Sequence, residues 1–201
     1  TYGETVTLPT ATTNFGTVVC DKTAADLVNA ETYTVTYTVA GTDNFEGDTK
    51  SITVTVNAKA ITEADVKLNG SLTYNGKEQT QPITVTEGIT YEVTGNKATN
   101  VGSYVLTILG TGNYTGEVKL SWSIKEAAAV VGKAPTAKEL TYTGTAQALV
   151  NAGTTADGKL VYSLSENGEF TESIPTGTNA GEYTVWYYVQ GDDNHSDTAK
   201  A

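Results

Sequence analysis

Apolar and polar side chains alternate strictly in several stretches of this chain. Between residues 33 and 39, tyrosine and valine occupy every odd position and threonine every even one. A period of two with this composition is typical of a β-strand with one buried and one solvated face. The same alternation places apolar residues at Ile52, Val54 and Val56, and at Leu120, Trp122 and Ile124.

Glycine and asparagine interrupt these stretches at short intervals. Asn75-Gly76, residues 111–113 and Asn167-Gly168 carry the residue types that favour hairpins and tight turns. Helical signals are weak. Residues 62–65 are compatible with one turn, and we interpret residues 125–130, which favour helix by propensity but are few, as a linker. Many short strands with frequent turns indicate an all-β chain of antiparallel β-sandwiches.

One segment pattern occurs three times along the chain. A tyrosine starts an alternating strand, which leads to a glycine and then to an asparagine followed by an aromatic residue, in residues 33–45, 104–114 and 183–195. Self-similarity at one length is the mark of an array of small units. We therefore expect three domains, at residues 1–59, 60–127 and 128–201. The repeated positions are core and turn residues, which indicates a copied scaffold and no copied reactive centre.

Tyrosines recur at two kinds of equivalent position. They are Tyr33, Tyr104 and Tyr183 at the strand starts, and Tyr2, Tyr74 and Tyr142 at the heads of the three repeats. We expect the strand tyrosines to belong to the inward face. We expect the hydroxyls of the head tyrosines to reach backbone groups and lock a corner of each sandwich.

The two ends of the chain look incomplete against this repeat. The first repeat starts directly at its Tyr2 element, and the third has no strand that matches residues 52–56. A sandwich with an open edge offers unpaired backbone groups, so we expect the C-terminal end to fray or to pair with a neighbouring molecule. The sequence shows no Met and no signal peptide, and we interpret it as a piece of a longer protein.

Composition excludes several classes of partner. The 23 acidic residues outnumber the 12 basic ones, and the net charge is −11. Such a field repels nucleic acid and anionic membranes, so we expect neither nucleic-acid binding nor membrane insertion. No apolar run approaches the roughly 18 residues that a membrane span requires. Cys20 is the single cysteine, which we interpret as a small apolar residue of a strand.

The repeated motifs resemble those of MBG-type bacterial immunoglobulin-like repeats. The resemblance rests on the Leu-Thr-Tyr-x-Gly heads, on the Asn-x-Gly turns at residues 100–102 and 179–181, and on the Gly-x-x-Asn-aromatic turns. The first repeat departs from it with Asn29-Ala30-Glu31. The resemblance implies tandem immunoglobulin-like β-sandwiches in a secreted or cell-surface bacterial protein. It implies spacing or presentation of other domains, and in some cases adhesion or glycan binding.

Two aromatic residues of the third repeat are candidates for ligand binding. Trp186 and Tyr188 stand where the first repeat has Thr36 and Thr38, on the face opposite the inward set. Large rings on a solvated face form a platform on which a glycan or a host surface protein can stack. The alternative is that a connection in the same repeat, residues 170–174, folds over these rings and buries them.

Reactive chemistry has little support in the sequence. His195 is the single histidine, and its counterparts in the other repeats are Phe45 and Tyr114, so we interpret it as a ring that packs in a turn. Asp192, Asp193 and Asn194 are a weak candidate for calcium, without the spacing of a calcium loop. No pair of acids lies in an apolar setting that suits glycosidic cleavage. We expect no enzymatic activity and no cofactor.

Overall fold

The computed structural model describes all 201 residues, which form an all-β chain of many small, mostly antiparallel sheets. The first repeat contains strands β1 Val18–Cys20, β2 Thr32–Val39 and β3 Asp48–Thr55, with the one-turn 3-10 helix η1 Ala24–Asp26. The second repeat contains β4 Lys59–Ala60, which starts one residue before the expected boundary, and η2 Glu63–Asp65, β5 Val66–Leu68, β6 Leu72–Thr73, β7 Gln79–Thr80, β8 Ile83–Val85, β9 Tyr91–Thr94, β10 Lys97–Ala98, β11 Gly102–Gly110, β12 Tyr114–Thr115, β13 Glu117–Lys125 and β14 Ala127–Ala128. The third contains β15 Thr136–Ala137, β16 Gln147–Ala148, β17 Val150–Asn151, β18 Gly158–Ser163, β19 Thr176–Gly177, β20 Trp186–Gly191 and β21 His195–Ser196.

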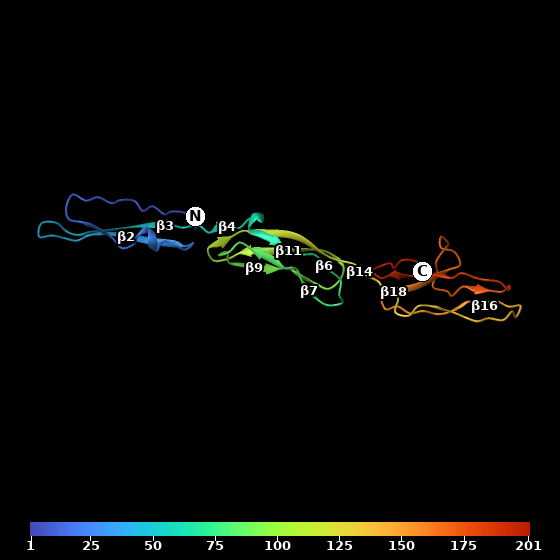
Figure 1. Ribbon diagram of the computed structural model, residues 1–201. Coiled ribbons are helices and arrows are strands. Elements are labelled where there is room, and N and C mark those ends of the chain that lie inside the picture. The colour runs from blue at the N-terminus through green and yellow to red at the C-terminus, as the bar shows by residue number, and fades with distance from the viewer. The chain divides into compact units, whose positions relative to one another are not determined.

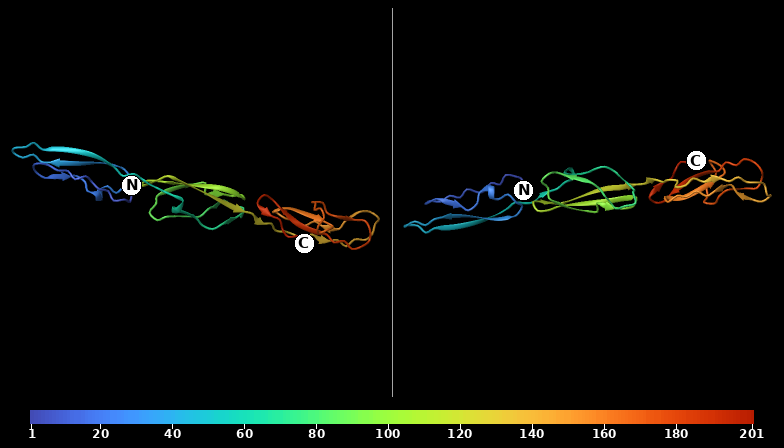
Figure 2. Two further views of the ribbon diagram at one scale, coloured as in Figure 1. Left: turned by 90° about the horizontal axis from the view of Figure 1, so that it is seen from above. Right: turned by 60° about the horizontal axis from the view of Figure 1, so that its bottom comes forward.

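Strand β2 shows how the alternating pattern becomes structure. It pairs antiparallel with β3 over its whole length and also with β1, so the sheet order is β1–β2–β3. Figure 1 labels β2 and β3 beside each other, and the views of Figure 2 keep the two strands together. On the solvated face, Thr36 lies opposite Ser51 and their hydroxyl oxygens are 3.1 Å apart. Cross-strand hydroxyl pairs of this kind stabilise the polar face of a sheet.

The opposite face of β2 builds a hydrophobic cluster. Val35 is fully buried, and Leu27, Tyr33 and Val56 surround it. The partly buried residues packed against this cluster are Val6, Leu8, Cys20, Tyr37, Ile52 and Val54. The sulfhydryl of Cys20 donates to the carbonyl of Lys22 at 3.0 Å.

A second cluster lies in the third repeat. Leu149, Val150 and Tyr162 form its buried centre, and Leu160, Ile174, Val185 and Tyr187 pack against them. Strand β20 pairs antiparallel with β18, and Val189 on β20 is fully buried. Trp122 on β13 is 5% exposed, which confirms its predicted core position.

The chain divides into two compact units. One comprises Thr1–Asn69, Pro82–Asn96 and Val105–Ser121, and the other comprises Gly70–Gln81, Lys97–Tyr104 and Trp122–Ala201. The second repeat therefore contributes residues to both units. Its four-stranded sheet has the order β6–β13–β11–β9.

Two segments near the repeat boundaries differ in how well the sequence predicted them. The single turn expected at residues 62–65 is confirmed by η2, in which the Asp65 carboxylate accepts from the backbone N–H and the hydroxyl of Thr62. The linker expected at residues 125–130 is wrong in part. Strand β13 continues to Lys125, and β14 then pairs in parallel with β21.

The last residues of the chain are bound within their own unit. Ala201 exchanges two backbone hydrogen bonds with Tyr187, both 2.9 Å long, and Thr198 donates its backbone N–H to the carbonyl of Val189. The fraying expected at this end is therefore wrong for Ala201. These bonds belong to the edge of β20 that faces away from β18.

Candidate functional site: the aromatic turns and the corners they contact

The three strand tyrosines make the same hydrogen bond. Their hydroxyls donate to the backbone carbonyl of an asparagine four residues earlier: Tyr33 to Asn29 at 3.1 Å, Tyr104 to Asn100 at 2.7 Å and Tyr183 to Asn179 at 3.0 Å. We call each of these tyrosine-plus-asparagine loops a corner. The hydroxyl fixes a loop that carries no regular backbone ladder, so the corner is held in one shape.

The sequence predicts that a different set of tyrosines, those at the heads of the repeats, makes the hydrogen bond that locks each corner. Tyr2, Tyr74 and Tyr142 make no hydrogen bond through their hydroxyls, and Tyr142 is 65% exposed. Instead Tyr2 and Tyr74 donate their backbone N–H groups to Asn57 and Lys125, each at 2.8 Å. The predicted position of the hydroxyl bond is therefore wrong: both kinds of tyrosine recur in the sequence, and recurrence alone does not reveal which kind makes the bond.

The repeated turns also share one backbone geometry. The aromatic residue donates its N–H to the carbonyl three residues earlier: Phe45 to Thr42 at 3.3 Å, Tyr114 to Thr111 at 3.0 Å and His195 to Asp192 at 3.2 Å. The glycine ahead of each turn is explained by close backbone approach. A Cβ on Gly110 would lie 2.9 Å from the backbone nitrogen of Thr115, and one on Gly41 would lie 3.0 Å from that of Gly47.

The asparagine of the turn reaches a corner of the preceding repeat. Asn113 accepts the backbone N–H of Ala30 on its side-chain oxygen at 2.7 Å, and its amide nitrogen donates to the side-chain oxygen of Asn29 at 3.1 Å. Asn194 accepts the backbone N–H of Val101 at 2.9 Å. The two contacts are equivalent, because Ala30 and Val101 both follow the corner asparagine.

A short parallel ladder accompanies each of these contacts. β12 pairs with β4, where Tyr114 lies opposite Lys59, and β21 pairs with β14, where His195 lies opposite Ala127. The ladders extend into the neighbouring backbone. Lys59 donates its N–H to the carbonyl of Asn113 at 2.9 Å, and Ala127 donates to that of Asn194 at 3.0 Å. Segments that connect consecutive repeats are thus paired strands.

Aromatic rings meet edge to face at the same places. Tyr2 and Tyr114 have centroids 5.4 Å apart with planes at 70°, and Tyr74 and His195 have centroids 5.2 Å apart with planes at 89°. Edge-to-face pairs at this separation are favourable. The predicted role of His195 as a packing ring agrees with this placement. We call the combination of asparagine contact, parallel ladder and ring pair a junction.

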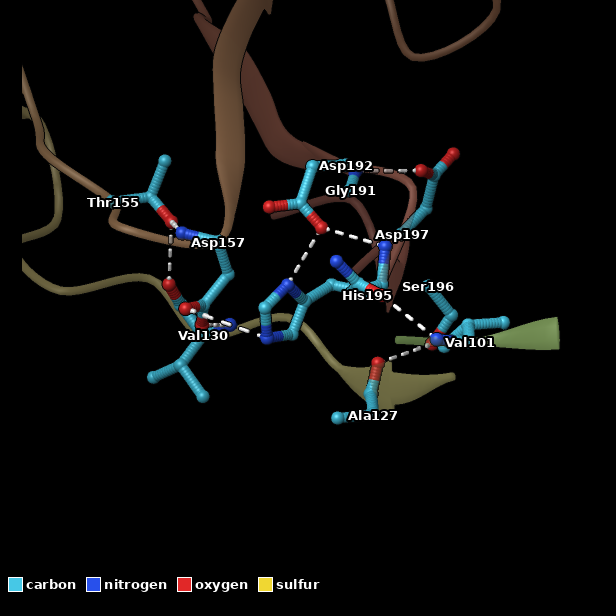
Figure 3. Close-up of polar contacts among 11 residues, drawn as sticks. Val101, Ala127, Val130, Thr155, Asp157, Gly191, Asp192, His195, Ser196 and Asp197 are labelled. Atoms are coloured by element: carbon cyan, nitrogen blue, oxygen red, sulfur yellow. Dashed lines mark hydrogen bonds and ion pairs between the residues drawn. The ribbon is translucent and has the colours of Figure 1, made fainter. Parts of the chain in front are cut away.

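The junction at His195 also contains acidic side chains (Figure 3). The Nδ1 of His195 lies 2.8 Å from Asp192, and its Nε2 lies 3.7 Å from Asp157. Asp157 in turn accepts the backbone N–H of Val130 at 2.9 Å. The pKa of Asp192 lies below its ordinary value, mainly because the backbone N–H of Asn194 donates to this carboxylate and further because His195 does. The polar contacts of the two ring nitrogens are with these carboxylates, and neither nitrogen hydrogen-bonds to a hydroxyl or a thiol.

The side-chain oxygens of Asp192 and Asn194, two residues of the calcium candidate, accept hydrogen bonds from backbone N–H groups. Asp192 accepts from the N–H of Asn194 at 2.8 Å, and Asn194 turns its side-chain oxygen to Val101. Asp193 is exposed and takes no part in these bonds. Nowhere does the chain bring together three or more His, Cys, Asp or Glu side chains in an arrangement that could hold a metal ion.

Trp186 and Tyr188 are both half-buried on β20. The ring of Phe170 packs against Tyr188, with centroids 5.0 Å apart and planes at 68°. The Nζ of Lys200 lies 5.0 Å from the centre of the Phe170 ring. Part of the segment 170–174 therefore covers Tyr188, while Trp186 lies opposite Ser163 in the register.

Comparisons with known proteins identify no relative. No family model, curated protein or solved structure matches this chain. None of its helices has both the length and the apolar character needed to cross a membrane.

Proposed function

We propose that this chain consists of structural spacer repeats, without enzymatic activity, in a secreted or surface-exposed bacterial protein. The observation that carries the proposal is the junction. Asn113 and Asn194, which recur as turn residues, each bind the backbone of a corner in the preceding repeat. A spacer has to transmit position from one repeat to the next, and a junction with directed hydrogen bonds can do this where a free linker cannot.

The interactions of one junction contribute a modest free energy, which is enough to restrain the position of one repeat against the next. Each net hydrogen bond contributes about 0.5–1.5 kcal/mol, and an edge-to-face ring pair contributes a similar amount. The junction at Asn113 combines two side-chain hydrogen bonds, a two-residue ladder and the Tyr2–Tyr114 ring pair. A sum of a few kcal/mol restrains local bending, although it is small beside the stability of a typical domain.

The extracellular setting rests on the resemblance to MBG-type immunoglobulin-like repeats and agrees with the composition. A net charge of −11 keeps a repetitive β-rich chain from self-association. Threonine and serine hydroxyls on strands β2 and β3 cover the solvated face.

Small-angle X-ray scattering tests the spacer proposal on the full chain. Asn113→Ala and Asn194→Ala should broaden the distribution of interatomic distances while circular dichroism stays unchanged. The matched control is Asn44→Ala, because the Asn44 side chain makes no hydrogen bond in this chain. Distributions that are identical for all variants would contradict a restraining junction.

A second candidate function is adhesion or carbohydrate binding through Trp186 and Tyr188. It is favoured by the partial exposure of both rings on one strand of the third repeat. A glycan array probed with the full chain and with Trp186→Ala separates this candidate from the spacer. Binding that the variant loses supports recognition, and the absence of any ligand-dependent rise in melting temperature supports the spacer.

A further inference from the structure

The chain contains three Asn-Gly dipeptides, and the structure places them in three different settings. They are Asn69-Gly70, Asn75-Gly76 and Asn167-Gly168. In such a dipeptide the backbone nitrogen of the glycine can attack the side-chain amide carbon of the asparagine, because glycine has no Cβ that hinders the approach. The attack closes a succinimide ring and releases ammonia. The surroundings of each dipeptide decide how readily this reaction starts.

Asn75-Gly76 leaves both the attacking nitrogen and the leaving group free. The backbone N–H of Gly76 and the side-chain nitrogen of Asn75 donate no hydrogen bond. The side-chain oxygen of Asn75 accepts the backbone N–H of Lys77 at 3.0 Å. That hydrogen bond draws electron density from the amide carbon and stabilises the charge that develops on the oxygen during attack. All three residues are exposed, and a Cβ on Gly76 would meet no atom within 4 Å, so water reaches the dipeptide.

Asn167-Gly168 has its attacking nitrogen engaged. The N–H of Gly168 donates to the carbonyl of Ser165 at 3.1 Å. The nitrogen has to lose its proton as it attacks, and a proton that is shared with a carbonyl is less accessible to base. The space beside this nitrogen is also filled, since a Cβ on Gly168 would lie 2.8 Å from the hydroxyl oxygen of Ser163. The turn therefore protects Asn167 by restraining the nucleophile.

Asn69-Gly70 is restrained at the asparagine instead. The side-chain nitrogen of Asn69, which is the leaving group, donates to the hydroxyl of Thr84 at 2.7 Å. The backbone N–H of Asn69 donates to the carbonyl of Pro82 at 2.9 Å, and the residue is half-buried. These bonds hold the asparagine against strand β8, whereas the attack requires its side chain to turn toward the nitrogen of Gly70.

We propose that Asn75 is a site of self-modification, at which the chain converts an asparagine to aspartate and isoaspartate in water. The nitrogen of Gly76 forms a bond to the side-chain carbon of Asn75, and the bond from that carbon to its amide nitrogen breaks. The proton of the Gly76 N–H passes through water to the leaving group, which departs as ammonia. One water molecule then opens the succinimide at either carbonyl and yields aspartate or isoaspartate. No oxidant or reductant is consumed.

The reactive asparagine lies directly beside the second junction. Tyr74 precedes Asn75, donates its backbone N–H to the carbonyl of Lys125 at 2.8 Å and packs its ring against His195. Isoaspartate carries the main chain through the former side chain, so it lengthens the backbone by one methylene. Either product adds a negative charge to a chain that is already acidic. The modification therefore changes the loop that positions one ring of the junction.

The third repeat has the same loop without the reactive amide. Thr143 stands there in the place of Asn75 and is followed by Gly144. In both loops a glutamine side chain donates to the carbonyl of the threonine six residues earlier, at 2.9 Å. The loop does not need an asparagine at this position to close, which makes threonine a matched replacement.

The experiment incubates the full chain at pH 8 and 37 °C and follows the three dipeptides by peptide mapping with mass spectrometry. Asn75 should deamidate about fivefold faster than Asn69 or Asn167, the factor that corresponds to one hydrogen bond of typical strength. Methylation by an isoaspartate-specific methyltransferase should label the product at position 75. Asn75→Thr is the matched control and should abolish this label while the slower reactions at the other two sites continue.

The decisive comparison is the same incubation in guanidinium chloride at a concentration that unfolds the chain. The three dipeptides then lose their distinct surroundings, and their rates should become similar. An equally large lead of Asn75 in the unfolded chain would assign the difference to neighbouring sequence and would overturn the proposal. Equal rates at the three sites of the folded chain, or aspartate without isoaspartate, would also overturn it. Failure here leaves the spacer proposal unaffected, because no junction contact involves the side-chain amide of Asn75.

Discussion

Ala30 donates its backbone N–H to the side-chain oxygen of Asn113 at 2.7 Å, although 83 residues separate them. Val101 and Asn194 repeat this relationship at 2.9 Å across 93 residues. In each case the donor follows a corner asparagine and the acceptor belongs to an aromatic turn. A contact that recurs between equivalent residues is a property of the repeat, and it links the two motifs that the sequence displays most plainly.

Removal of the junction asparagine should expose the corner it binds. In Asn194→Ala the N–H of Val101 loses its partner, and the free energy of unfolding should fall by about 1 kcal/mol because the contact is only partly buried. Amide exchange at Val101 should accelerate. Asn44→Ala serves as the control and should change neither quantity, and equal effects of the two variants would show that the asparagine acts only within its own turn.

The corner tyrosines should differ in what their hydroxyls contribute. The hydroxyl of Tyr33 donates to the Asn29 carbonyl and accepts the Asn29 N–H at 2.9 Å, and the residue is buried. Tyr33→Phe should therefore lower the free energy of unfolding by about 1–3 kcal/mol. Tyr183→Phe removes one bond at a site that is 41% exposed and should cost less. Chemical denaturation of the two variants checks the order, and a larger loss at Tyr183 would contradict it.

Acid should weaken the two 3-10 turns. The pKa of Asp65 lies below its ordinary value of 3.8, mainly because the backbone N–H of Thr62 donates to the carboxylate and then because the Thr62 hydroxyl does. Asp26 has a lowered pKa for the same reasons at Thr23. A carboxyl with a lowered folded pKa stabilises the fold above its unfolded pKa, and that contribution is lost as the pH falls through the lowered pKa.

Melting temperatures between pH 2.5 and 6 measure this loss. Asp26→Asn and Asp65→Asn together should flatten the decline below pH 4, because the amides cannot titrate. Asp43→Asn is the matched control, since the Asp43 side chain is exposed and makes no hydrogen bond. A decline that is equally steep in the double variant would place the acid sensitivity in other groups.

The pairing of β2 with β3 could be expected from the sequence, because Tyr33, Val35 and Ile52 reveal a buried face by alternation alone. The parallel ladders that β4 and β14 form with β12 and β21 could not be expected from the sequence. Lys59-Ala60 and Ala127-Ala128 have neither alternation nor β-branched residues, and their partners lie more than fifty residues away. Tertiary contacts override weak local propensity at such places.

One feature of the sequence indicates the junction, although it lies outside the local turn pattern. The Asn-aromatic turn and the corner asparagine recur together, and joint recurrence favours contact between them. Local turn chemistry explained Asn113 and Asn194 by their backbone preferences. That explanation left their side-chain amides without a partner, and the structure supplies it in the preceding repeat.

Phe170 should control access to the aromatic face of the third repeat. Its ring packs on Tyr188 at 5.0 Å, so it competes with any ligand that stacks there. Trp186 is half-buried and Trp122 is 5% exposed, and acrylamide should therefore quench Trp186 more strongly than Trp122. Single-tryptophan variants, Trp122→Phe and Trp186→Phe, resolve the two signals. Phe170→Ala should expose Tyr188 and should increase any glycan binding, because it removes the covering ring without altering β20. Unchanged binding in Phe170→Ala, together with loss in Trp186→Ala, would assign recognition to Trp186 without Tyr188.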